Sequence, residues 1–162
     1  MKTMNWMLTL AMLFALLPAV AVTADDAKKE KEMTVKVLGS GQLTVPKSFK
    51  SVPPKMSMIQ AEFNAMLPDG ERIKTARMTM MAAGGSVDAN VARWKMQFKN
   101  GTDPKTEKMK LGSWNAQLVE LEGDYAGMRS PVQKGYGMLA AILMEKEEGP
   151  KFFVKLIGPK DV

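Results

Sequence analysis

Methionine is the residue type whose spacing in this chain most directly suggests chemistry. The 162 residues include 16 methionines but no cysteine and no histidine. Two M-x-M patterns, at residues 56–58 and 78–80, would place thioethers in pairs, because side chains at i and i+2 of a strand share a face. Thioethers prefer soft ions such as Cu(I) and Ag(I). One hypothesis is therefore a metal site, and the alternative is adaptable core filling by the same methionines, which are Met56, Met58, Met78 and Met80.

The missing residue types exclude several classes of catalyst. Without cysteine there is no thiolate nucleophile, disulfide or zinc-thiolate site, and without histidine there is no imidazole base. Carboxylates remain, and they cluster at Glu120, Glu122 and Asp124 and again at Glu145, Glu147 and Glu148. Neither cluster has the spacing of a calcium loop. We assign no catalytic residue and no cofactor, and expect a protein that is not an enzyme; a carboxylate-dependent hydrolase is the less favoured rival.

The segment Gly123–Gly135 is a candidate interaction surface. It carries three glycines and a proline, and its 13 residues exceed what a simple connection needs. Tyrosine, methionine and arginine are enriched at protein interfaces. The sequence therefore predicts a contact surface in and beside this loop, and a plain surface loop is the alternative; the residues are Tyr125, Met128, Arg129 and Tyr136.

Residues 1–24 have the pattern of a secretory signal peptide. Lys2 is their only charged residue, an apolar stretch follows, and Val22-Thr23-Ala24 has the small residues of a cleavage site. A membrane anchor is disfavoured because the apolar run is short for a spanning helix and contains Pro18. Cleavage after Ala24, or alternatively after Ala21, would leave no stable membrane span.

Removal of 24 residues leaves 138 of the 162, and loss of the Lys2 charge changes the formal net charge from +6 to +5. Residues 25–32 are predicted to be a charged, flexible leader, and residues 33–162 are predicted to form one domain. No basic run is interleaved with aromatic residues, which argues against a nucleic-acid partner. We expect a periplasmic or secreted binding or accessory protein whose partner is an envelope protein or a small ligand. The oligomeric state stays open.

Alternation and turn signals predict a mainly antiparallel sheet. Ile59–Leu67 alternates apolar and polar residues, Pro68-Asp69-Gly70-Glu71 marks a turn, and Ile73–Ala82 is the return strand. The charged segment Thr102–Lys110 is predicted to be a loop. Further strands are expected at residues 33–38, 43–45, 114–122, 136–146 and 152–158.

One amphipathic helix is predicted over about residues 87–99. Its apolar side chains recur at helical spacing and form one stripe, made of Val87, Val91, Trp94 and Phe98. Ser86 is a suitable N-cap. The preceding Gly84-Gly85 would also suit an anion at the helix start, but the lysine of a phosphate-binding loop is missing, so a turn followed by a cap is the simpler interpretation.

The stretch Tyr136–Met144 is apolar on both of its strand faces. Such a strand is central and needs a covering layer on each side of the sheet. The predicted helix supplies one layer. For the other face three alternatives remain open: the N-terminal segments, a partner, or a helix that this chain lacks after Val162.

Three segments resemble parts of small exported bacterial proteins of unknown function: Gly84–Phe98, with the form G-G-S-V-D-A-N-V-x-R-W-K-x-Q-F, Gly135–Ile142 and Phe153–Pro159. The resemblance spans about residues 43–159. More loosely, the element order is similar to the Mog1/PsbP-like fold, in which helices pack on an antiparallel sheet. This implies an α+β domain with a binding or assembly role, and it brings no site residues. The C-terminal helix of that fold has no counterpart before Val162.

Export is directly testable. Because the first 24 residues combine a basic start, an apolar run and a cleavage site, cell fractionation is expected to find the protein outside the cytoplasm. N-terminal sequencing of that material should start at Asp25, or at Val22 if cleavage follows Ala21. A full-length chain recovered from the cytoplasm would contradict the prediction.

Overall fold

The computed structural model describes residues 32–39, 41–69, 72–127 and 131–160. The chain divides into two compact units, residues up to Lys47 and residues from Ser48 onward. In the first unit, β1 (Met33–Val37) pairs antiparallel with β2 (Gly41–Val45), and Val35 lies opposite Leu43. Buried and exposed residues alternate along both strands, as the period-two pattern predicts.

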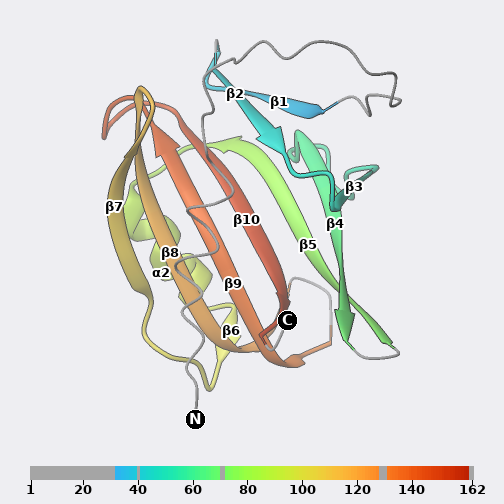
Figure 1. The fold of residues 1–162 in the computed structure, drawn as a ribbon. Coiled ribbons are helices and arrows are strands. Elements are labelled where there is room, and N and C mark those ends of the chain that lie inside the picture. The colour runs from blue at the N-terminus through green and yellow to red at the C-terminus, as the bar shows by residue number, and fades with distance from the viewer. Residues whose placement is uncertain (1–31, 40, 70–71, 128–130, 161–162) are drawn as a thin grey trace, which may run out of the picture. The chain divides into compact units, whose positions relative to one another are not determined.

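The second unit is an eight-stranded antiparallel sheet with the helix α2 (Val87–Lys95). The strands run in the order β3-β4-β5-β10-β9-β8-β6, and β7 also pairs with β8 (Figure 1). The predicted α+β class, dominated by antiparallel sheet, is therefore confirmed. The strands are β3 (Phe49–Val52), β4 (Ala61–Asp69), β5 (Arg72–Ala83), β6 (Phe98–Lys99), β7 (Lys105–Leu111), β8 (Trp114–Tyr125), β9 (Gln133–Met144) and β10 (Lys151–Pro159).

The strand β9 is central, as its sequence predicts. It lies between β8 and β10, and the adjacent residues Ile142 and Leu143, which point to opposite faces, are both fully buried. The two predicted hairpins, β4–β5 and β9–β10, are also present. No helix in the described part of the chain is long and apolar enough to cross a membrane.

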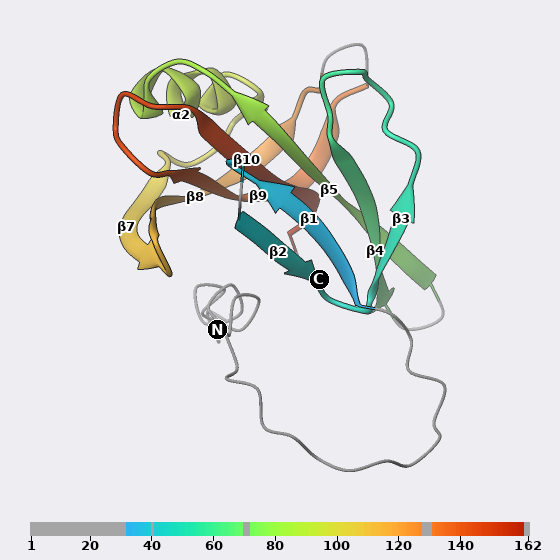
Figure 2. The same cartoon turned by 90° about the horizontal axis from the view of Figure 1, so that it is seen from above.

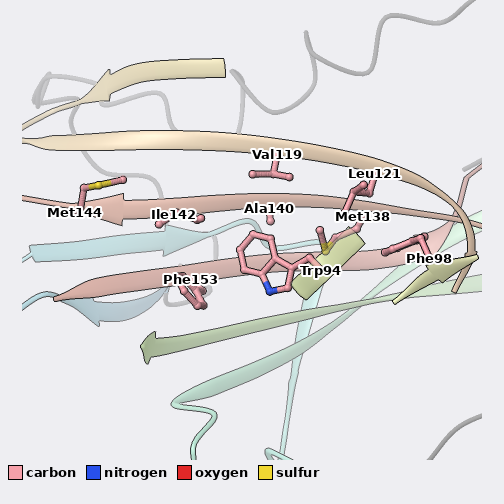
Figure 3. Packing of buried hydrophobic residues seen from close by; sticks show 9 residues of the cluster. All are labelled: Trp94, Phe98, Val119, Leu121, Met138, Ala140, Ile142, Met144 and Phe153. Atoms are coloured by element: carbon pink, nitrogen blue, oxygen red, sulfur yellow. The ribbon is translucent and has the colours of Figure 1, made fainter. Parts of the chain in front are cut away.

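The helix α2 packs on one face of β8, β9 and β10 (Figure 2). Ser86 caps it as predicted, because its hydroxyl accepts a hydrogen bond from the Ala89 N–H at 3.2 Å. Trp94 is 2% exposed, and its ring meets Phe153 edge-on with centroids 5.2 Å apart. Figure 3 shows the cluster around it, which also contains Phe98, Val119, Leu121, Met138, Ala140, Ile142 and Met144.

The predicted C-terminal boundary of the helix is wrong. The helix ends at Lys95, not near residue 99, because the chain turns at Met96 and Gln97 and continues into β6. The Gln97 carbonyl accepts a hydrogen bond from the Ala126 N–H at 2.7 Å. Phe98 then pairs with Tyr125 and still fills the core, but from a strand.

The segment predicted as a charged loop, Thr102–Lys110, contains the strand β7. Its residues are mostly exposed, because β7 lies at an edge of the sheet and pairs with β8 alone. An edge strand needs no apolar alternation, and its lysines protect the free edge from further pairing. The sequence analysis also missed β3, whose four residues offer too short a pattern.

Truncation of Trp94 should destabilise the protein strongly. Trp94→Ala removes the largest side chain of the core cluster, and an expected loss of about 3–5 kcal/mol in the free energy of unfolding follows from the cavity it leaves. Urea denaturation at pH 7 measures it. The matched control is Met96→Ala, two residues on but 76% exposed, which should change little. A Trp94→Ala variant that unfolds like the parent would contradict this packing.

Candidate functional site

Three basic side chains gather beside the helix, on the face of the sheet that the helix covers. Lys155 of β10 pairs with Ala140 and Thr79, and the next residue on the same face, Ile157, pairs with Arg77 of β5. Lys155 and Arg77 are therefore diagonal neighbours. Arg93 comes from the last turn of α2. We refer to Arg77, Arg93 and Lys155 as the basic cluster.

The ammonium of Lys155 lies over the indole of Trp94, 5.2 Å from the ring centroid. Within the described part of the chain, this cation–π contact is the one specific interaction that the ammonium makes. No carboxylate pairs with it and no acceptor there takes a hydrogen bond from it. Burial, together with the positive charges of Arg93 and Arg77, lowers the pKa of Lys155 from 10.5 to about 8. A cation in this position lacks compensation for its lost hydration.

Arg77 is held in place by a buried carboxylate. Glu62 of β4 is 1% exposed, and it accepts two hydrogen bonds from Arg77, Nε to Oε1 at 2.7 Å and Nη2 to Oε2 at 2.9 Å. The backbone N–H of Lys55 donates a third, at 3.0 Å to Oε2. The Arg77 hydrogen bonds lower the pKa of Glu62 despite its burial, and Glu62 in turn raises the pKa of Arg77.

The charges of this region do not balance. Two arginines and one lysine stand against a single carboxylate, and that carboxylate is engaged by Arg77. Arg93 donates to the side-chain oxygen of Asn90, which is neutral. With Lys155 protonated, the cluster therefore carries an excess of positive charge that favours an anion.

A row of aromatic rings flanks the basic cluster. Tyr125 contacts Phe98 with ring centroids 5.3 Å apart, and it stacks on Tyr136 at 6.4 Å and 13°. Burial raises the pKa of Tyr125, and the nearby charge of Arg77 opposes that shift. Of the four residues predicted to form a contact surface, Tyr125 and Tyr136 are thus side by side. Met128 and Arg129 lie outside the described residues.

The pairing of β8 with β9 is irregular just before Tyr125. The register of β8 against β9 shifts between Gly123 and Tyr125. The backbone at Gly123 has φ +152°, and a Cβ there would lie 2.7 Å from the Cα of Gly101. Both glycines are required for this close crossing, because any side chain would separate the strands.

The methionine pairs lie in different environments. Met78 and Met80 are 1% and 3% exposed on the face of β5 that points away from the helix, where they fill the core. Met56 and Met58 precede β4 and are 45% and 62% exposed. Within the described ranges, no three acidic side chains converge as metal ligands would. Of the two methionine pairs on which the Cu(I) hypothesis depends, one is therefore exposed and the other is buried.

The carboxylates of β8 are each engaged. Glu120 pairs with Lys105 at 3.4 Å and Glu122 with Lys160 at 2.8 Å. Asp124 accepts hydrogen bonds from the Asn100 side chain and the Gly135 N–H. Glu145, Glu147 and Glu148 are exposed in the turn after β9. The carboxylates of β8 are therefore accounted for by pairing with neighbouring groups, whereas those of the second cluster are simply solvated.

Sequence reasoning missed the basic cluster. One signal was available, because Lys155 interrupts the apolar residues 152–159 at a position that faces the helix. No sequence signal pointed to the pairing of Glu62 with Arg77, because this pairing depends on the register of two strands whose residues are 15 positions apart.

Comparisons of this chain with protein-family models, with curated proteins and with solved structures give no match. The fold and the site therefore rest on the chain's own residues. They define an α+β domain whose antiparallel sheet carries a basic and aromatic cluster beside its helix.

Removal of Arg77 should destabilise the domain. Arg77→Met leaves Glu62 buried without its cation, which costs about 3–5 kcal/mol in unfolding free energy at pH 7, measured by urea denaturation. The double variant Glu62→Leu with Arg77→Met removes both charges and should recover most of that loss.

The pH dependence provides the control. The pKa of Glu62 is lowered on folding, so the pair stabilises the protein above pH 4.5 and loses this effect as the pH falls through the folded-state pKa. The difference between parent and Arg77→Met should therefore shrink in acid. A difference that is constant from pH 7 to pH 3 would contradict the assignment.

Proposed function

We propose that this protein is an exported, non-enzymatic binding module that holds an anionic ligand against the basic cluster. The observation that carries the proposal is the half-buried ammonium of Lys155, which faces an indole ring and two arginines but no acidic partner in the described chain. An anionic group of the ligand supplies the missing counter-charge. A location in the periplasm or outside the cell is part of the proposal, and the signal-peptide pattern of residues 1–24 supports it.

The cluster is preorganised for such a ligand. Glu62 takes one side of the Arg77 guanidinium and orients it, so that the charge is fixed before the ligand arrives. Binding to a preformed charge constellation avoids the cost of ordering long side chains. A partly desolvated cation also attracts an anion more strongly than an exposed one does.

The aromatic row suits a ligand with an apolar part next to its anionic group. Tyr125 and Tyr136 are half-buried, and their rings stack beside the charges. Tyrosine offers broad contact area at low conformational cost. A ligand that joins an anion to a flat apolar group would use both features.

The carboxylate arrangement favours binding over hydrolysis. A glycosidase-like hydrolase needs two carboxyl groups on one cleft, one of them with a raised pKa. Glu62 is the one fully buried carboxylate in the described ranges, and the hydrogen bonds from Arg77 lower its pKa. It is therefore unsuited to act as a general acid.

Lys155→Met tests the proposed function. Benzenesulfonate and phenyl phosphate serve as probes, since each joins an anion to an aromatic ring, and binding is measured by calorimetry at low salt. Methionine keeps the packing over Trp94 but removes the charge, so affinity should fall about 10- to 100-fold. The matched control is Lys110→Met, which removes an exposed lysine of β7 and should leave affinity unchanged. Equal affinity in the parent and in Lys155→Met would overturn the proposal.

The pH profile gives an independent measure of the same group. Affinity for benzenesulfonate, whose charge is constant, should decline above about pH 8 as Lys155 loses its proton. Stability should change in the opposite direction: between pH 8 and 10.5 the unfolded chain binds more protons than the folded one, so the unfolding free energy rises with pH. Lys155→Met should remove both dependences.

A further inference from the structure

A cavity of about 920 Å³ opens at the start of α2, and none of the basic or aromatic residues described above lines it. Its walls come from the first residues of the helix, from β7 and β8, from the end of β9 and from the turn that leads into β10. The volume falls in the range of ligand-binding cavities.

Gln117 is the residue in this cavity that ordinary packing leaves unexplained. It lies in β8 on the same face as Val119 and Leu121, which belong to the core cluster, and it pairs with Ile142. Its side chain is 6% exposed and lines the cavity. Among the described residues no hydrogen bond to its amide is present.

The other buried polar side chains near the cavity are satisfied. The Asn90 amide donates to the carbonyls of Gly84 and Ser86, at 3.1 and 2.8 Å. The Lys151 ammonium donates to two carbonyls of the turn before β10. The Gln117 amide makes no hydrogen bond to the described part of the protein and faces the cavity, so its donor and its acceptor are both available to a bound group.

We propose that this cavity binds a short peptide segment, with a backbone amide of the segment paired to the Gln117 side chain. A carboxamide presents a donor beside an acceptor, which is the complement of a peptide group. Apolar side chains line the same cavity and would receive side chains of the peptide; they are Val87, Met109, Met144 and Pro150. Methionine suits such adaptable contacts. A sugar is disfavoured because no lining residue is aromatic.

The charges of the lining favour a basic peptide. Three carboxylates line the cavity, from Asp88, Glu147 and Glu148. Two lysines, Lys108 and Lys151, oppose them, so the charged side chains of the lining sum to −1. This preference is opposite to that of the basic cluster, so the two sites are chemically distinct and this proposal does not depend on the first.

The test is a titration of ¹⁵N-labelled protein followed by NMR. The probe is N-acetyl-Leu-Lys-Leu-amide, and the comparison peptide carries Glu in place of Lys. The Lys peptide should shift the side-chain NH₂ signals of Gln117 and the backbone signals of Gly85 and Val87, whereas the Glu peptide should bind several-fold more weakly.

Gln117→Leu keeps the volume and removes the amide. It should weaken the Lys peptide about tenfold while the unfolding midpoint does not fall, because no internal hydrogen bond is lost. The matched control is Gln133→Leu, which removes an exposed amide of β9 outside the cavity and should leave binding unchanged.

Three results would overturn the proposal. They are unchanged Gln117 side-chain signals at saturating peptide, equal affinity in the parent and in Gln117→Leu, and shifts of the same signals by maltotriose instead of the peptide. The first and third are read on the parent protein, so they decide the matter even if Gln117→Leu does not fold.

Discussion

The packing of Trp94 against the sheet is the interaction on which the second unit depends. The central strand β9 is apolar on both faces, so the sheet needs a layer over β8, β9 and β10. The helix α2 has only nine residues and cannot supply that layer by its own propensity. One indole, wedged edge-on against Phe153, concentrates the required apolar area at a single point. The position of the indole ring determines which side chains of β10 it covers: Phe153 lies within the core cluster, and Lys155 lies at its edge.

The core cluster ends in different surroundings at the two ends of the short helix. At its C-terminal end, Lys155 is placed over the same indole, and the arginines of β5 and α2 surround it with like charge. At its N-terminal end, Val119 is the last residue that β8 contributes to the core cluster, and Gln117 faces a cavity whose charged side chains are mostly acidic. The two candidate sites thus lie at opposite ends of the same short helix.

Local patterns predicted much of the fold. The N-cap at Ser86, the hairpins and the buried centre of β9 follow from periods and turn signals, because these features depend on residues close in sequence. The predicted end of the helix was wrong because Phe98 continues the apolar spacing of the helix, although at this residue the backbone already pairs with β8. The strand β7 was not predicted because its pairing with β8, and not an apolar pattern of its own, makes this segment a strand. Tyr125 and Tyr136 were singled out by residue type and do stack on one another, whereas Arg77 and Lys155 were missed.

By itself, the sequence determined which chemistry is missing and which segments alternate. A chain without cysteine or histidine has no thiolate and no imidazole, whatever its fold. Only the tertiary structure decided which charges meet. Glu62 and Arg77 are joined by strand register, Lys155 is brought to Trp94 by helix packing, and Gln117 is left without a partner where the core ends. These relations depend on distances between residues far apart in the chain, and electrostatic and desolvation energies depend on those distances rather than on residue type.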